Sequence, residues 1–214
     1  MWGNYNSINN NTCKDNKFGL SGTYLYDSTI ENNICKNNER GIDLGFSKNN
    51  VIKNNICSYN RRYGIRLVSS SENILTNNII MSNSLYGVCL ENSECRNNII
   101  YNNQFYYNHG SGDSYDPLCI QACDNGTTNY WNSSSGVGNY WHDWACNNNS
   151  NDQNNDGIVD WPYLIDGSSG ARDYYPLKGV SDVLEIPDTE VLTPLFVLFI
   201  CTIFIRKQYY NISV

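Results

Sequence analysis

An internal repeat of about 22 residues constrains the fold of this chain more than any other feature of its sequence. Pairs of asparagines recur at a regular interval, and an apolar residue or a cysteine stands two positions before each pair. The pairs begin at Asn10, Asn32, Asn54, Asn77 and Asn97. The preceding residues are Ile8, Ile30, Ile52, Leu75 and Cys95. One repeat is too short to bury these side chains alone, so successive repeats must stack.

Each repeat continues with another asparagine and then a glycine. The asparagines are Asn16, Asn38, Asn60, Asn83 and Asn103, and the glycines are Gly19, Gly41, Gly64 and Gly87. The apolar runs between them are short and alternate with period two, which is typical of strands. Asparagine suits a left-handed turn, and glycine suits close approach of two backbones. The pattern predicts an all-β parallel β-helix, a single-stranded solenoid of about five coils. Leucine-rich repeats are the alternative, but their leucine signature and helix formers are missing.

The repeat also resembles a known family. The pattern N-x-I-x-x-N-x-x-x-G-I-x-L, clearest at residues 32–44, is similar to the repeats of NosD-type proteins and of the wider pectin-lyase-like superfamily. The resemblance covers roughly residues 5–110 and implies a right-handed β-helix. Three later segments resemble the C-terminal ends of many archaeal and bacterial NosD-type proteins: Gly138–Trp141, Asp152–Asp160 and Tyr175–Leu177.

Composition and charge limit the class of partner. The net charge is −7 and the isoelectric point is about 4.7, so the chain has no basic surface for nucleic acid. The first residues have neither a basic stretch nor an apolar run, so no signal peptide is recognisable. The chain opens almost inside a repeat, and an uncapped coil would leave strand edges open. We therefore expect the chain to be an N-terminally truncated piece of a longer protein.

The C-terminal part predicts a membrane anchor. Val191–Ile205 is uncharged, is followed by Arg206 and Lys207, and would span roughly 22 Å as a helix. Snorkelling basic residues would make up part of the shortfall. The positive-inside rule then places the C-terminus in the cytoplasm and the β-helix at the cell surface. The expected parts are the repeats (1–117), an aromatic and Asp-rich cap (118–178), a linker (179–190), a transmembrane segment (191–205) and a cytoplasmic tail (206–214).

Two further features bear on the location of the protein. The tail resembles the sorting tails of archaeal surface proteins, although its motif Glu185-Ile186-Pro187-Asp188 departs from the commonest forms. Asn-x-Ser/Thr sequons agree with an outward location. They begin at Asn10, Asn125, Asn132 and Asn148.

Nine cysteines are present, and three of them occupy equivalent repeat positions, Cys13, Cys35 and Cys57. Stacked coils place these side chains in parallel at about 4.8 Å, which suits a ladder of free thiols better than disulfide bonds. Cys119, Cys123 and Cys146 fall in the predicted cap, where a disulfide is plausible.

The sharpest chemical motif is Asp152–Asp160. Oxygen ligands from Asp152, Asn154, Asp156 and Asp160, with the carbonyl of Ile158, match the first nine positions of a calcium loop. Position 12 is Tyr163 in place of the usual glutamate, so Asp166 or water would complete the shell. The motif predicts a structural Ca²⁺, and an Asx-rich turn without metal is the alternative.

Outward positions of the coils give weaker signals. Asp43, Arg66 and Cys89 are equivalent in successive coils. Polysaccharide lyases of the resembling superfamily use acidic residues for Ca²⁺ and an arginine or lysine as base on an outward sheet. A cross-coil ion pair on a solvated face is the simpler interpretation of Asp43 and Arg66.

The cap offers two more candidate groups. His109 and His142 could join Cys119, Cys123 and Cys146 in a metal site, but their spacing matches no standard zinc pattern. Aromatic residues could stack on sugars, although packing of the cap is the simpler use. They are Trp131, Tyr140, Trp141, Trp144 and Trp161.

These features favour a non-catalytic, membrane-anchored cell-surface protein that binds glycans or belongs to an envelope layer. A fragment of a polysaccharide lyase, hydrolase or epimerase with active-site coils upstream is the alternative. A copper-handling accessory role, as in NosD, is the weaker alternative, because the chain has few histidines and methionines.

Overall fold

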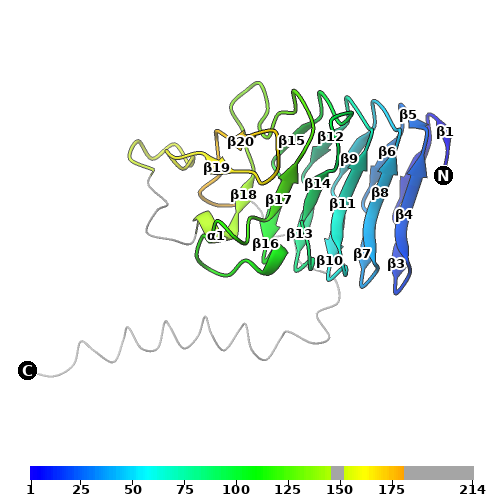
Figure 1. Cartoon of the computed structure of the whole chain (residues 1–214), viewed down its shortest axis with the longest axis horizontal. Helices are drawn as coiled ribbons and strands as arrows, with labels where there is room; N and C mark the ends of the chain where they lie inside the picture. Colours follow the sequence, from blue (N-terminus) through cyan, green and yellow to red (C-terminus); the bar gives the residue numbers. More distant parts are fainter. Residues whose placement is uncertain (146–151, 181–214) are drawn as a thin grey trace, which may run out of the picture. The chain divides into compact units, whose positions relative to one another are not determined.

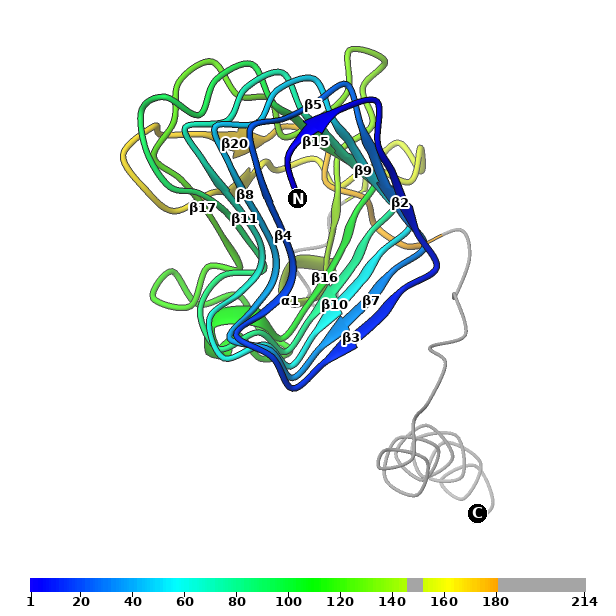
Figure 2. The same cartoon turned by 90° about the vertical axis from the view of Figure 1, so that its right-hand side faces the viewer.

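The computed structural model describes residues 1–145 and 152–180, which lie in one compact unit, Met1–Val180. Three parallel sheets wind around a common core, and each coil contributes one short strand to each sheet (Figure 1). Figure 2 looks along the stack, and the three sheets enclose the core on three sides. The structure confirms the parallel β-solenoid of about five turns and excludes the leucine-rich repeat.

The three sheets are named here after their first strands. The β2 sheet contains β2 (Ser7–Asn9), β6 (Thr29–Glu31), β9 (Val51–Lys53), β12 (Ile74–Thr76) and β15 (Ile99–Tyr101). The β3 sheet contains β3 (Thr12–Lys14), β7 (Ile34–Lys36), β10 (Ile56–Ser58), β13 (Ile79–Met81), β16 (Gln104–Tyr106) and β18 (Tyr140–Trp141). The β4 sheet contains β4 (Phe18–Thr23), β8 (Arg40–Gly45), β11 (Tyr63–Val68), β14 (Val88–Leu90) and β17 (Ala122–Asp124).

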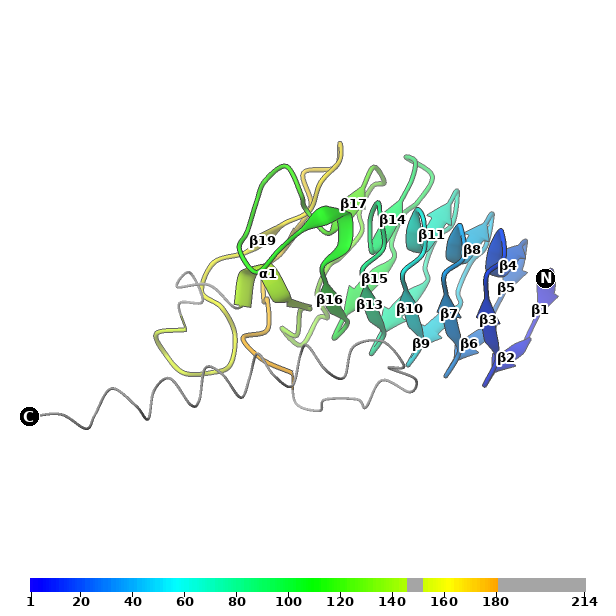
Figure 3. The same ribbon diagram turned by 90° about the horizontal axis from the view of Figure 1, so that it is seen from below.

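Short elements complete the unit at its two ends. β1 (Gly3–Asn4) pairs with β5 (Leu25–Tyr26) at the N-terminal end. A 3₁₀ turn (Asn108–Gly110), α1 (His142–Ala145) and the antiparallel pair β19 (Tyr163–Leu164) and β20 (Arg172–Asp173) lie toward the other end. Figure 3 shows β19 and α1 beyond the last coils, at the end of the stack opposite the N-terminus.

The predicted alignment of the repeat is correct for four coils and wrong for the fifth. Leu75 pairs with Ile100, not with Cys95, and Asn102-Asn103 therefore continues the series that begins with Asn10-Asn11. Asn97-Asn98 belongs to a different corner of the coil. The error arises because the chain between β14 and β15 is longer than its counterparts, which shifts the sequence spacing without changing the stacking.

The paired asparagines have two different roles at each corner. The first residue of a pair, such as Asn54, is exposed and has a positive φ of 55°. The second, such as Asn55, is buried. Its N–H and Nδ2 groups both donate to Oδ1 of Asn78 in the next coil, at 2.9 and 3.0 Å. Its Nδ2 also donates to the carbonyl of Ile30 in the previous coil, at 2.9 Å.

Three such side-chain ladders run through the coils, one at each corner. Their members are Asn11, Asn33, Asn55, Asn78, Asn103 and Asn139 in the first, Asn16, Asn38, Asn60, Asn83, Asn108 and Gln121 in the second, and Ser28, Asn50, Asn73, Asn98 and Asn129 in the third. Because each member satisfies buried backbone groups of its neighbours, the corners need no water.

Each ladder ends at a buried aspartate. The backbone N–H of Asn139 donates to Asp173 Oδ2 at 2.7 Å, Gln121 Nε2 donates to Asp143 Oδ1 at 2.6 Å, and Asn129 Nδ2 donates to Asp124 Oδ1 at 3.0 Å. Each member of a ladder donates at least one hydrogen bond to the member in the next coil, so the last member has a donor that needs a final acceptor. A carboxylate supplies only acceptors and makes the stronger, charge-assisted bonds.

The core side chains grow in size toward the cap. The predicted cysteine stack is confirmed, since Cys13, Cys35 and Cys57 pair in register, and all three are free thiols. The same column continues with Ile80, Phe105 and Trp141. Phe105 stacks on Trp141 at 4.1 Å, and Trp141 stacks on Tyr163 at 4.0 Å with nearly parallel planes. These rings close the C-terminal end of the core, as the packing interpretation predicts for Trp141, whereas Trp161 is exposed.

Stacking continues beyond the boundary predicted at residue 117, because β17 pairs with β14 and β18 with β16. Among residues 1–145 and 152–180, no helix has the length and hydropathy needed to cross a membrane. The predicted transmembrane segment 191–205, the tail 206–214, most of the linker 179–190, and Cys146, Asn148 and Cys201 lie outside the described residues.

Candidate functional site

The outward face of the β4 sheet brings the chemically active side chains together. Asp43, Arg66 and Cys89 occupy one outward position in successive coils, as predicted. The register adds Ser21 before Asp43 and Cys123 after Cys89. Each residue stands beside its neighbour at the strand spacing of about 4.8 Å.

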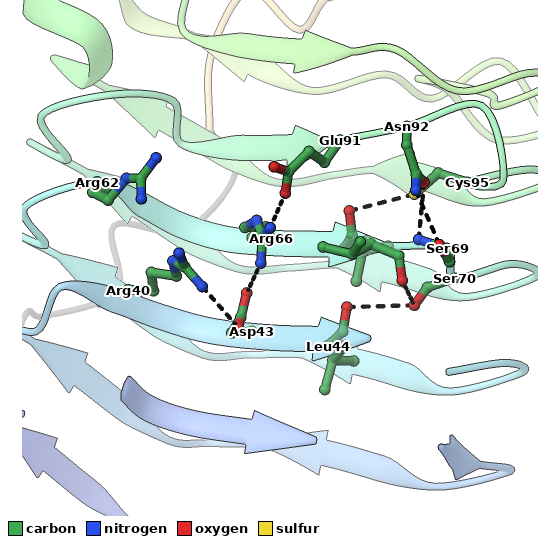
Figure 4. Close-up of polar contacts among 12 residues, drawn as sticks. Arg40, Asp43, Leu44, Arg62, Arg66, Ser69, Ser70, Glu91, Asn92 and Cys95 are labelled. Carbon is green, nitrogen blue, oxygen red and sulfur yellow. Dashed lines mark hydrogen bonds and ion pairs between the residues drawn. The ribbon is translucent and has the colours of Figure 1, made fainter. Parts of the chain in front are cut away.

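An ion-pair network covers the middle of this face (Figure 4). Arg40 Nη1 lies 3.3 Å from Asp43 Oδ2, and Arg66 Nη1 lies 2.9 Å from Asp43 Oδ1. The other guanidinium nitrogen of Arg66 contacts Glu91. Arg66 is therefore held between two carboxylates, and Asp43 between two guanidinium groups.

Aromatic rings lie next to the arginines. The Arg40 guanidinium is 5.3 Å from the centre of the Phe18 ring, and that of Arg66 is 5.9 Å from the Tyr63 ring. Such contacts stabilise a cation and keep its stem against apolar surface. The Nε atoms of Arg40 and Arg66 are buried, and neither has a hydrogen-bond partner.

The electrostatics of the network suit binding better than proton transfer. Burial acts to lower the pKa of the Arg66 guanidinium, but its hydrogen bonds to Glu91 and Asp43 outweigh burial and raise that pKa. An arginine held more firmly in its protonated form cannot serve as a general base. The structure therefore confirms the ion-pair interpretation of Asp43 and Arg66.

Two thiols lie further along the same face. Cys89 and Cys123 pair in register and hydrogen bond to each other, and Tyr63, Leu85 and Tyr86 pack around them. The hydrogen bond with Cys123 raises the pKa of Cys89, and the same bond lowers the pKa of Cys123. Cys123 is consequently the better candidate for a thiolate.

The predicted calcium loop forms a compact Asx turn. Asp152 accepts hydrogen bonds from the N–H groups of Asp156 and Gly157 at 3.0 and 3.1 Å. Asp160 accepts the N–H of Gln153 at 3.0 Å. Burial acts to raise the pKa of Asp152, but these amides and the Lys178 ammonium, 3.4 Å away, outweigh it and lower that pKa.

The remaining predicted calcium ligands already have partners in the protein. The carboxylate of Asp166, the predicted substitute for the missing glutamate, accepts a hydrogen bond from Tyr86, and its backbone pairs with Cys123. Asn154 Oδ1 accepts the N–H of Asp156 at 3.2 Å, and Ile158 pairs with Leu177. The loop is therefore joined to the end of the cap through its backbone.

Among the described residues, the two histidines form no metal centre with Cys119 and Cys123. His109 stacks on Tyr86 at 4.5 Å, and its Nδ1 lies 3.1 Å from the carbonyl of Ile120. His142 Nε2 lies 3.0 Å from Asp113. In residues 1–145 and 152–180, no group of three or more His, Cys, Asp or Glu side chains is arranged to hold a metal ion. Cys119 and Cys123 are free thiols, so the cap disulfide does not join these two residues.

Sequence reasoning missed Glu91 and Cys123 as members of the outward face. Glu91 directly follows the last residue of β14, and it could have been found from the alignment of Leu90 with Leu67. Cys123 lies 34 residues after Cys89, because a long loop precedes β17. No repeat spacing could reveal that neighbour.

A family model matches the part of the chain that contains the coils. Residues 1–146, more than half of the chain, match the model of a family described as periplasmic copper-binding protein (NosD). The chain belongs to the NosD family. No curated protein matches this NosD-family chain.

A solved structure resembles it in part. That structure is the A-module of the mannuronan C-5 epimerase AlgE4 from Azotobacter vinelandii, with 18% sequence identity and a TM-score of 0.31. The similarity covers 64% of the NosD-family chain and 48% of the epimerase module, so the chain spans about half of that module.

Proposed function

We propose that this protein is a non-catalytic β-helix that binds carbohydrate on the outward face of its β4 sheet. The observation that carries the proposal is the Arg40–Asp43–Arg66–Glu91 network, in which the charges are balanced within the protein and rings lie beside the arginines. Sugars are recognised by rigid polar groups that exchange hydrogen bonds with hydroxyls and by rings that cover apolar faces.

The same network argues against catalysis on this face. Each carboxylate of the network contacts a guanidinium group, and Arg66 is held protonated. Lyase, hydrolase or epimerase activity would need a group that gives or takes a proton near neutral pH. A fragment of such an enzyme stays the alternative, and it is tested by the same experiment.

The test is a screen of the full chain against immobilised neutral and acidic glycans, with product analysis of the same mixtures. We expect saturable binding, no release of shorter or unsaturated products, and weaker binding for Arg66→Ala. The exposed Arg61→Ala is the control and should bind as the native chain does. Product release that Arg66→Ala abolishes would establish the enzyme in place of the binding protein.

We propose that Asp152, Asn154, Asp156, Ile158 and Asp160 hold a structural Ca²⁺ that fixes the cap. Support comes from the oxygen spacing and from the loop's closure, with Gly157 at a positive φ of 84°. Ca²⁺ would have to displace Lys178 from Asp152 and draw the three carboxylates of the loop into one shell, because they are not arranged around a metal in this structure. Calorimetry should detect Ca²⁺ binding that Asp156→Ala removes and Lys178→Gln strengthens. Equal thermal stability with Ca²⁺ and with chelator would refute the site.

We also propose that the protein is held outside the cytoplasm by a membrane anchor at residues 191–205, as the sequence predicts. Support comes from the uncharged run and the basic residues after it. The full chain should sediment with membranes, and protease added outside intact cells should digest its β-helix. Recovery of the full chain in the soluble fraction would refute the anchor.

Copper handling is the second candidate function. It is supported by the description of the matched family and by the hydrogen-bonded thiols of Cys89 and Cys123, since soft thiolate ligands select Cu(I). Cu(I) competition with a chromophoric chelator should show uptake by the native chain and loss of uptake in Cys89→Ser/Cys123→Ser. Uptake that is unchanged in this variant would remove the support that the thiols give.

A further inference from the structure

An exposed column of aromatic side chains follows the ends of the β4-sheet strands. Trp2, Tyr24 and Phe46 occupy one position in three successive coils, since Gly3 pairs with Leu25 and Tyr26 bridges to Lys48. Their exposed fractions are 82%, 52% and 51%. The rings of Tyr24 and Phe46 stack with centres 5.3 Å apart and planes inclined by 23°.

Neither folding nor turn geometry accounts for this column. The rings lie outside the buried core, so they add little to its packing. Tyr24 and Phe46 have positive φ angles of 54° and 51°, where bulky side chains are disfavoured and asparagine or glycine would cost less. Large rings retained at exposed and unfavourable positions are typical of a binding surface.

The column stops where the next coil has a small residue. Ser69 takes the position after Phe46, since Lys48 bridges to Ser71. Ser69 is tied to the following coil, because its N–H donates to Asn92 Oδ1 at 2.9 Å and its Oγ accepts Asn92 Nδ2 at 2.9 Å. The ring of Phe46 is therefore followed by a small hydroxyl residue and not by a fourth ring.

Polar groups suited to sugar hydroxyls lie close to this position. Figure 4 shows Ser69 and Asn92 at the ends of their strands, on the side of the network where Arg66 meets Glu91. The charged network lies within the β4 sheet, and Tyr24 and Phe46 directly follow the ends of two strands of that sheet. A ring stacked on Phe46 would lie over Ser69, which takes the next position in the column.

The charged groups around the column favour an uncharged ligand over an anionic lipid surface. Asn49 Nδ2 donates to Asp27 Oδ1 at 2.5 Å, and Lys48 is neutralised by Glu72 at 3.0 Å. The chain as a whole has a net charge of −7. A surface that docks on anionic lipid would need an excess of lysine and arginine beside its rings. Amide and carboxylate groups around stacked rings fit an uncharged, hydroxyl-rich ligand.

We propose that Phe46 stacks a pyranose ring of a neutral polysaccharide in the position above Ser69, with Tyr24 stacked on the other face of the Phe46 ring. The proposal rests on the carbohydrate-binding function proposed above and assigns it a ring-stacking subsite. Asn92 and Ser69 are the neighbours that would exchange hydrogen bonds with the hydroxyls of that ring.

The experiment is affinity electrophoresis of the full chain in gels that contain hydroxyethylcellulose, dextran or galactomannan. The test variant is Phe46→Asn, which removes the ring and fits the left-handed backbone. Tyr59→Asn is the matched control, because Tyr59 is also exposed and has a φ of 54° at a different corner. Loss of an aromatic anchor should weaken binding by about tenfold or more.

Retardation that Phe46→Asn loses and Tyr59→Asn keeps would establish the subsite. Retardation that both variants keep would overturn the subsite and leave carbohydrate binding intact. Absence of retardation in native gels with every polysaccharide, together with no binding on the glycan screen, would overturn both. Sedimentation of the native chain, but not Phe46→Asn, with phosphatidylglycerol vesicles would assign the column to a membrane surface instead.

Discussion

At the scale of single residues, the second asparagine of each pair makes the buried hydrogen bonds that join successive coils. Asn78 shows why: its Oδ1 accepts two hydrogen bonds from Asn55, and its Nδ2 donates to Asn103 Oδ1 and to the carbonyl of Ile52. Each of these groups is buried, so the side chain has no substitute in solvent. The first asparagine of the same pair, Asn77, is exposed and serves the turn.

The variant Asn78→Ala tests this division of roles. It leaves several buried donors and acceptors unpaired, so we expect a loss of at least about 3 kcal/mol in the free energy of unfolding. Asn77→Gly keeps the left-handed turn and should change stability by less than about 1 kcal/mol. Urea unfolding of both variants measures the difference. Equal losses of unfolding free energy in the two variants would mean that the hydrogen bonds of the ladder add no stability beyond that of the turn.

Asp173, which ends the first ladder, makes stability depend on pH. Burial raises its pKa from 3.8 to about 6, although Trp141 and Asn139 donate hydrogen bonds to it. The folded state therefore binds a proton more readily than the unfolded state between these pH values. The stabilising contribution is complete below about pH 4 and is lost as pH rises through about 6.

This group should contribute about 2.5 kcal/mol more at pH 4 than at pH 7, with other carboxylates acting in parallel. Asp173→Asn removes the titration and also places an amide N–H₂ group against donors, so it should lower stability at every pH. The measurement is the unfolding free energy of both proteins from pH 4 to pH 7. If the two curves run parallel, Asp173 does not titrate in this window.

At the scale of the strands, the glycines set how closely coils approach. In β8, a Cβ added to Gly41 would lie 2.4 Å from the carbonyl oxygen of Gly64, whereas one added to Gly45 would meet nothing within 4 Å. The glycine is needed for close approach and not for a left-handed turn, because Gly41 has no positive φ.

Gly41→Ala should therefore push two coils apart and cost about 1–3 kcal/mol or more, as overpacking does elsewhere. Gly45→Ala lies in the same strand and provides the control, with a change of less than about 1 kcal/mol. Thermal unfolding of the two variants separates close approach from strand propensity. A similar loss in both variants would contradict the steric explanation.

The strand scale also shows what could be predicted from sequence and what could not. Residues that repeat in every coil, such as Ile30, Gly41 and Leu44, stack on their equivalents, so the sequence spacing identifies which residues are neighbours in space. Four coils and the outward line of Asp43 and Arg66 were therefore predictable. The fifth coil was not, because the longer segment before Ile99 broke the spacing. The aspartates that end the ladders come from segments outside the repeat, and no period connects them to their partners.

At the scale of the whole molecule, the solenoid is polarised. Its amide ladders run one way, its core side chains grow from cysteine to tryptophan along the same direction, and carboxylates close the far end. The proposed binding surface lies on the coils, whereas the proposed calcium loop lies in the cap. Loss of Ca²⁺ should therefore affect stability before it affects ligand binding.

The rates at which the stacked cysteines are labelled provide a measurement of this polarity. Thiols inside a folded core react with a labelling reagent only when the surrounding structure opens, so each rate reports a local opening equilibrium. Cys13 is half-buried and Cys35 and Cys57 are fully buried in the next two coils. We expect native-state labelling to proceed in the order Cys13, Cys35, Cys57, measured by mass spectrometry of peptides after timed quenching. Equal rates for all three would show that these coils open together in one cooperative unit. The first three coils thus each carry a thiol whose labelling rate reports when that coil opens.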